Sequence, residues 1–183
     1  MNVLIIYSSL SGCTKRIADA LYNGLPAGVE KTIVPVKEAP ENLDTYDLVA
    51  LGYWVDKGGP NNEMMKFIEG CSGKKVFVFA TLAHPADTEY GCQTILRGCK
   101  LVEEAGNEVV GHFVGNGVLS PQVIARFKAM AETDAGNPHA MTPEKALRYE
   151  VLKDHPTEAE CALASERLNE RLRYLEGIAK LQG

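Results

Sequence analysis

Short apolar runs alternate with longer amphipathic stretches along this chain. The apolar runs predict five strands, at residues 2–7, 30–36, 47–53, 75–81 and 108–114. Between them, apolar residues spaced three and four positions apart predict helices near 14–25, 60–70, 88–105 and 121–131. Strands that alternate with helices in this way are typical of a parallel sheet with helices packed on its faces.

The strand order follows from burial and from the handedness of the connections. Three runs, NVLIIY, DLVALGY and KVFVFAT, are almost continuously apolar, as expected for strands covered on both faces. Pro35 removes a backbone donor from the second run, which therefore belongs at an edge. Right-handed crossovers then favour an α/β fold with a doubly wound five-stranded parallel sheet of order 2-1-3-4-5.

The chain changes character after residue 131. Residues 132–142 are rich in turn formers, and a short helix is expected from Pro143. The segment TEAE, from Thr157 to Glu160, predicts a capping box at the start of a last helix. That helix carries an apolar stripe that we expect to dock on the sheet or on a second subunit: Cys161, Ala164, Leu168, Leu172, Leu175 and Ala179.

Length and charge narrow the class of protein. The 183 residues suit one domain, with a core at 1–131 and a C-terminal helical extension at 132–183 packed on it. A formal net charge of -5 argues against nucleic-acid binding, which needs a clustered basic face. No run approaches the roughly 20 apolar residues of a membrane span, and VLII is too short for a signal peptide. We therefore expect a cytoplasmic protein.

Cysteine and histidine spacing predicts neither disulfides nor a metal site. The five cysteines form no CxxC pair, so reduced thiols are expected. The four histidines show no HExxH pattern and no zinc-ligand spacing with the cysteines.

A surplus of hydroxyl groups marks the loop after the first strand. Ligands of doubly wound sheets bind beyond the carboxyl ends of the strands, where the strand order reverses. The first loop at that edge consists of Ser9, Leu10, Ser11, Gly12, Cys13 and Thr14. A helix start needs only one capping hydroxyl, so the extra hydroxyls favour a phosphate cradle over a plain cap. Neither GxxxxGK[ST] nor GxGxxG is present.

Two further loops belong to the same edge. The third strand leads into a loop that contains the only tryptophan: Trp54, Val55, Asp56, Lys57 and Gly58. The indole of Trp54 either covers a planar cofactor or belongs to the core. The fourth strand ends at Thr81, Leu82, Ala83 and His84. His84 is either a cofactor contact or a solvated loop residue, and helix packing is the default explanation for Tyr90.

The first loop resembles the phosphate loop of flavodoxins, in which Ser/Thr-x-Thr-Gly-x-Thr wraps the phosphate of FMN. Ser9, Ser11, Gly12 and Thr14 match that pattern, with serine replacing threonine at 11 and Cys13 where asparagine is common. The resemblance implies a flavodoxin-like fold and FMN as cofactor. It also implies that the second and third loops flank the isoalloxazine ring, and that Gly58 is the glycine whose peptide reorients on flavin reduction.

Other segments resemble one particular group of flavodoxin-like proteins. GYWVDKG, ATLAHPADTEYG, GNGVLSP and PHAMTPEKALRYE are similar to short flavodoxin-like proteins associated with bilirubin reductase systems. This implies an electron-transfer protein that serves a redox partner, a reductase or dehydrogenase, with a tetrapyrrole (bilirubin) reductase as the candidate acceptor. No catalytic residue is assigned, and a homodimer stays open.

A second function class remains open, and two others are disfavoured. The alternative is an FMN-dependent NAD(P)H:quinone or flavin reductase, whose substrate pocket would have to come from the C-terminal third. A receiver domain needs acidic residues where Ser8 and Ser9 follow the first strand. A low-molecular-weight phosphatase needs Cys-x5-Arg, but Asp19 stands six residues after Cys13.

Overall fold

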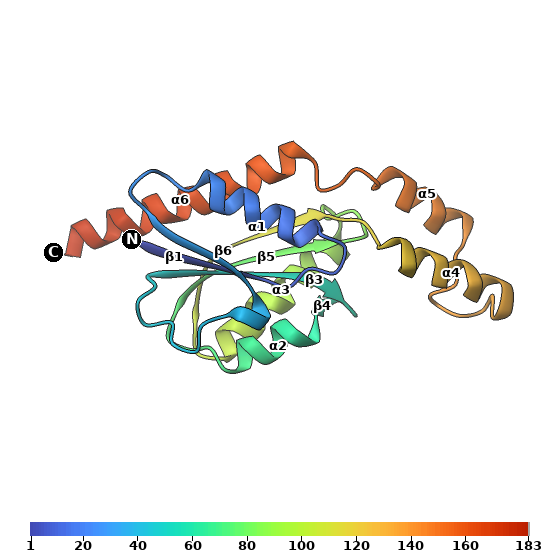
Figure 1. Cartoon of the computed structure of the whole chain (residues 1–183), viewed down its shortest axis with the longest axis horizontal. Coiled ribbons are helices and arrows are strands. Elements are labelled where there is room, and N and C mark those ends of the chain that lie inside the picture. Colours follow the sequence, from blue (N-terminus) through green and yellow to red (C-terminus); the bar gives the residue numbers. More distant parts are fainter. Residues whose placement is uncertain (183) are drawn as a thin grey trace.

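Five parallel strands form the central sheet of the computed structural model, which describes residues 1–182 (Figure 1). They lie in the order β2-β1-β3-β5-β6. Their bounds are β1 Asn2–Tyr7, β2 Glu30–Pro35, β3 Leu48–Asp56, β5 Lys75–Leu82 and β6 Glu108–Asn116. The two-residue strand β4 (Gly59–Pro60) pairs antiparallel with the end of β3, and a 3-10 turn, η1 (Val36–Glu38), follows β2. The predicted 2-1-3-4-5 order is confirmed, whereas β4 and η1 were not predicted.

Helices cover both faces of the sheet (Figure 1). Helices α1 (Cys13–Gly24) and α6 (Glu158–Gln182) pack on one face, and α2 (Asn62–Glu69) and α3 (Glu89–Glu104) on the other. Successive residues of β1 alternate between two apolar clusters: Val3 and Ile5 face α1 and α6, and Leu4 and Ile6 face α2 and α3. This explains the continuous apolar runs, because both sides of each central strand are buried.

The last helix docks on the sheet, as its apolar stripe predicts. Ala164, Leu168 and Leu172 are buried in the cluster that contains Phe113 of β6 and the apolar side of α1. Ala179, the last member of the predicted stripe, is exposed. Figure 1 shows why: the C-terminal end of α6 runs past the amino ends of the strands. The stripe therefore packs along only part of its predicted length.

Helices α4 (Pro121–Thr133) and α5 (Pro143–Val151) project beyond the carboxyl ends of the strands (Figure 1). We call residues 121–151 the arm. Neither helix contains a buried residue. The segment between them is irregular, as predicted, and is held by Lys145, whose Nζ donates to the carbonyls of Pro138 and Ala140 at 2.6 and 2.7 Å. Its end is fixed to α4, since the Met141 N–H donates to the Phe127 carbonyl at 2.9 Å.

Glu160 joins the start of α6 to the end of β6. Its carboxylate accepts hydrogen bonds from the N–H groups of Thr157 and Asn116 at 2.7 and 2.9 Å, and Oε2 lies 2.6 Å from Nδ1 of His155. Thr157 Oγ1 accepts from the Glu160 N–H at 3.2 Å, so the predicted capping box is confirmed. Burial alone raises the pKa of Glu160, but these hydrogen bonds outweigh it and hold that pKa below its usual range.

Replacing Glu160 by glutamine is expected to lower the free energy of unfolding by about 1–2 kcal/mol near neutral pH. A carboxyl whose folded-state pKa is depressed stabilises the fold above its unfolded pKa, and this contribution is lost as the pH falls through the folded pKa. Urea unfolding should therefore show the wild type and the variant converging below about pH 4. Glu158→Gln, an exposed change in the same helical turn, is the control. A difference that persists unchanged in acid would contradict this role.

Candidate functional site

A pocket of about 680 Å³ opens at the carboxyl edge of the sheet. It lies between the loops that follow β1, β3 and β5 and the arm, and its size is typical of cofactor sites. Predicted site residues that line it are Leu10, Ser11, Trp54, Val55, Asp56, Lys57, Thr81, Leu82, Ala83 and His84. The remaining predicted residues, which do not line it, are Ser9, Gly12, Cys13, Thr14 and Gly58. The three loops thus meet around one pocket.

The turn into α1 lacks the side-chain cap that an ordinary helix start has. Gly12 has φ 90°, in the left-handed region that favours glycine, and no side chain caps the helix. The hydroxyl oxygen of Ser9 is buried, and no group within residues 1–182 forms a hydrogen bond with it. A buried hydroxyl without a partner costs about 1–3 kcal/mol. Beside the positive end of α1, this hydroxyl fits an anionic acceptor such as a phosphate oxygen.

The side chains of Cys13 and Thr14 fix the position of the first loop. Thr14 is buried, and its Oγ1 lies 2.9 Å from Oγ1 of Thr81 at the end of β5. Cys13 is also buried, and its Sγ accepts from the Val118 N–H at 3.3 Å and from the Ser11 hydroxyl at 3.3 Å. The two side chains therefore connect the first loop to the end of β5 and to the segment after β6, at residues that line the pocket.

The loop after β3 is a tight hairpin. Asp56 pairs with Gly59 across a two-residue turn, in which Lys57 has φ 49° and Gly58 has φ 80°. Positive φ at both central residues is the geometry of a type I′ turn, for which glycine at the second position is well suited. The hairpin forms one rim of the pocket, and its tip is the peptide unit on which the expected reorientation would occur.

Trp54 and Tyr53 lie on opposite sides of β3. Tyr53 is fully buried, and its hydroxyl donates to the Thr94 carbonyl of α3 at 3.1 Å. Burial raises the pKa of Tyr53 well above its usual range, with a smaller contribution from Cys99, so the hydroxyl remains a donor. Trp54 is partly exposed and lines the pocket. Of the two interpretations of this tryptophan, the structure favours the pocket wall over the core.

The loop after β5 is anchored by the strand beside it. The Asn116 Oδ1 accepts from the Ala86 N–H at 2.7 Å, and the Gly117 N–H donates to the Leu82 carbonyl at 2.8 Å. Asn116 and Gly117, at the end of β6, thus fix the third loop, a role that the sequence did not reveal. His84 lies at the pocket and stacks edge-on with Tyr90, with ring centroids 5.1 Å apart.

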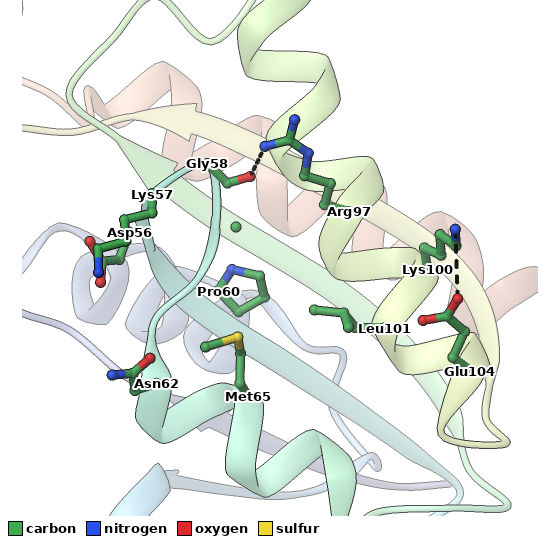
Figure 2. A pocket seen from close by; sticks show the side chains of 11 residues that line it. Asp56, Lys57, Gly58, Pro60, Asn62, Met65, Arg97, Lys100, Leu101 and Glu104 are labelled. Carbon is green, nitrogen blue, oxygen red and sulfur yellow. Dashed lines mark hydrogen bonds and ion pairs between the residues drawn. The ribbon is translucent and has the colours of Figure 1, made fainter.

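A second pocket, of about 410 Å³, lies between the hairpin, α2 and α3 (Figure 2). Arg97 of α3 reaches into it, and its Nη1 donates to the Gly58 carbonyl at 3.1 Å. Lys100, one turn further along α3, pairs instead with Glu104 at 3.6 Å. Figure 2 shows that Arg97 contacts the tip of the hairpin whereas Lys100 does not. The hairpin tip is therefore held by a charged donor, which no sequence motif indicated.

The arm forms the other wall of the larger pocket. The residues that it contributes are Val123, Arg126, Phe127, Met130, His139, Arg148 and Tyr149. None of them was predicted as a site residue. The sequence indicated this segment only in general terms, through the change in character after residue 131 and through the alternative function, whose substrate pocket would come from the C-terminal third. The predicted helix near 121–131 does form, and the Ser120 hydroxyl at its start accepts from the Val123 N–H at 3.4 Å.

Within residues 1–182, no three histidine, cysteine, aspartate or glutamate side chains are grouped so that they could hold a metal ion. Over the same range, no helix has the length and apolar character needed to cross a membrane.

Comparison with known proteins gives matches in both sequence and fold. A family model described as "Flavodoxin domain" matches residues 4–169. The flavodoxin-like domain-containing protein BilS of Clostridioides difficile is 32% identical over 168 residues, which cover 90% of this chain and 93% of BilS.

Among solved structures, oxidised Flavodoxin 2 of Bacillus cereus superposes with a TM-score of 0.57 at 22% identity, over 93% of this chain and 99% of that one. The flavodiiron core Flv1 of Synechocystis superposes with a TM-score of 0.62 at 13% identity. That match covers 97% of this chain but only 36% of the larger protein. At these identities the structural matches establish the fold alone.

Proposed function

Because this chain belongs to the flavodoxin domain family and is a flavodoxin-like electron-transfer protein, we propose that it binds FMN in the larger pocket and carries electrons in the cytoplasm to a partner reductase. The observation that carries the proposal is the buried, unpartnered hydroxyl of Ser9 beside the glycine-led start of α1. It offers a hydrogen-bond donor to a phosphate next to Leu10 and Ser11, the two residues of the first loop that line the pocket.

The residues present fit FMN. Ser9, Ser11 and the free N–H groups at the start of α1 would hold its phosphate, and the indole of Trp54 offers an aromatic surface for its ring. The loop from Thr81 to His84 would shield the ring from water on the other side. Bound FMN supplies the electron chemistry, and the protein supplies binding and electrostatics.

We propose a tetrapyrrole (bilirubin) reductase as the specific acceptor. The basis is the resemblance of GYWVDKG and the later segments to proteins associated with bilirubin reductase systems, together with the similarity to BilS over most of both chains. The formal net charge of -5 suits docking to a basic surface of such a partner.

The alternative is an FMN-dependent reductase that oxidises NAD(P)H itself, and the arm's contribution to the pocket is the observation that favours it. The two functions are separated by anaerobic kinetics of the FMN-loaded protein. An electron carrier, once reduced with dithionite, should reduce cytochrome c rapidly, and the oxidised form should not be reduced by NADH or NADPH alone. Rapid flavin bleaching by either nucleotide would instead establish the reductase.

Arg97 is expected to tune the reduction potential of the bound flavin through the hairpin. Arg97→Met removes the donor that holds the Gly58 carbonyl, which then becomes free to turn toward the flavin and accept a hydrogen bond from the N–H formed on reduction. One such bond contributes about 1 kcal/mol, or roughly 20 mV for a two-electron couple. Lys100→Met removes the same charge from the same pocket without touching the hairpin. Relative to this control, Arg97→Met should raise the potential; equal potentials would contradict the role.

A further inference from the structure

The larger pocket has two walls with different chemistry. One wall consists of the three loops that we assign to FMN. The other wall belongs to the arm and includes Arg126, Phe127, His139, Arg148 and Tyr149. These residues lie 42 or more positions after the last predicted flavin contact, His84. All but His139, which lies between the two helices, are on α4 or α5, and neither helix carries a buried residue. The core does not need them for packing, so their presence in the pocket calls for a separate explanation.

The charge of the pocket is opposite to that of the protein. Its lining contains the cationic side chains of Lys57, Arg126 and Arg148, against a single carboxylate, Asp56. The ion pairs formed within residues 1–182 involve none of these three cations. In a chain with a formal net charge of -5, two arginines that face a cavity without acidic partners make a local site for an anion.

Arg148 has a fixed orientation and an unsatisfied hydrogen-bond donor, both of which suit an anionic ligand. Its guanidinium lies over the ring of Tyr149, with Cζ 5.1 Å from the ring centroid, and Nη2 donates to the Tyr149 hydroxyl at 3.3 Å. These contacts orient the group. Its Nε is buried, and within the part of the chain that the structure describes it has no hydrogen-bond partner. A buried donor on a cation is costly to leave unsatisfied, and an anionic oxygen would satisfy it.

Flat side chains surround these cations. The rings of Phe127 and His139 are stacked, with centroids 5.5 Å apart and an interplanar angle of 24°. Together with Tyr149, they give the arm wall aromatic surfaces that suit a planar, conjugated molecule, whereas Trp54 on the opposite wall is assigned to the flavin.

We propose that the arm wall binds a second small molecule beside the flavin: a planar conjugated compound that carries a carboxylate or phosphate group. The arginines bind its anionic group, and the aromatic side chains contact its plane. The inference rests on the proposed function, because the remainder of the same pocket is assigned to FMN. The phosphate of FMN binds at the first loop, so Arg126 and Arg148 are available to the second ligand.

A matched pair of probes tests the proposal on the FMN-loaded protein. Calorimetric titration compares 2-naphthoate with 2-naphthamide, which share a ring system and differ in charge. Hydrogen bonds to a charged group contribute about 1.5–3 kcal/mol, so we expect about a tenfold or greater preference for the carboxylate. In the variant Arg126→Gln/Arg148→Gln this preference should fall to about twofold or less. The control Arg167→Gln/Arg173→Gln removes the same charge from exposed positions on α6 and should keep it.

The outcomes separate this inference from the proposed function. FMN retention is measured first by absorbance after desalting. A protein that retains FMN but binds both probes equally, or binds neither up to about 10 mM, overturns the arm site and leaves the proposed function intact. If the arginine variant loses affinity for FMN but not for riboflavin, the arginines hold the cofactor phosphate, and the second ligand is also overturned. A protein that retains no FMN counts against both.

Discussion

A carboxylate introduced at Ser9 is expected to weaken FMN binding at least about a hundredfold. The hydroxyl of this residue is buried at the phosphate loop and has no hydrogen-bond partner within residues 1–182. Ser9→Asp would place a negative charge about 5 Å from the phosphate, which costs roughly 3 kcal/mol at an effective dielectric constant of about 20. The dissociation constant is measured by following the quenching of flavin fluorescence as protein is added.

Two comparisons separate the effect of the introduced charge from that of side-chain volume. Ser9→Asn introduces a side chain of nearly the same size without a charge, so it should weaken FMN binding about tenfold by its volume alone. Riboflavin lacks the phosphate and should bind the aspartate and asparagine variants equally. If aspartate and asparagine weaken FMN binding to the same extent, Ser9 does not face a phosphate, and the assignment of the first loop is wrong.

The second large effect is expected at Gly91, where α3 begins close to the third loop. A Cβ atom at this position would overlap the backbone carbonyl of Ala86. The loop cannot move away freely, because the Ala86 N–H is bonded to Asn116 on its other side at 2.7 Å. Overpacking against fixed backbone costs about 1–3 kcal/mol, so Gly91→Ala should lower the free energy of unfolding by that amount.

Gly91→Ala should also weaken flavin binding. The displaced loop carries Leu82 and His84, so the affinities for FMN and for riboflavin should fall together. Gly70→Ala is the matched control, since its Cβ would meet only ordinary contacts at 3.7 Å or more, and φ there is -92°. Urea unfolding and flavin titration of both variants measure the effect. A fully stable Gly91→Ala protein with normal flavin affinity would contradict the described packing.

Much of the fold could be predicted because the apolar pattern of each segment agrees with its burial in the folded sheet. The apolar runs of β1, β3 and β5 are buried on both sides, and Pro35 does end the edge strand β2. The hairpin after β3 was missed because Lys57 adopts a positive φ that only the pairing of Asp56 with Gly59 imposes. A non-glycine residue in that conformation gives no signal in the sequence.

The candidate site was likewise predicted only in part. The three loops were predicted because the carboxyl edge of a doubly wound sheet fixes where ligands bind, and ten of their residues do surround one pocket. The individual arm residues that line the pocket were not predicted, because their positions depend on contacts between distant residues, such as the bond from Met141 to Phe127. The contact of Arg97 with Gly58 spans 39 positions and is equally invisible in the sequence.

The central claim is that the first loop holds the phosphate of FMN, and one measurement tests it most directly. The purified protein is mixed with an excess of FMN or of riboflavin, desalted, and its retained flavin is quantified by absorbance. We predict stoichiometric retention of FMN and much weaker retention of riboflavin, because only FMN satisfies the Ser9 hydroxyl and the start of α1. Equal retention of the two flavins, or retention of neither, would contradict the account.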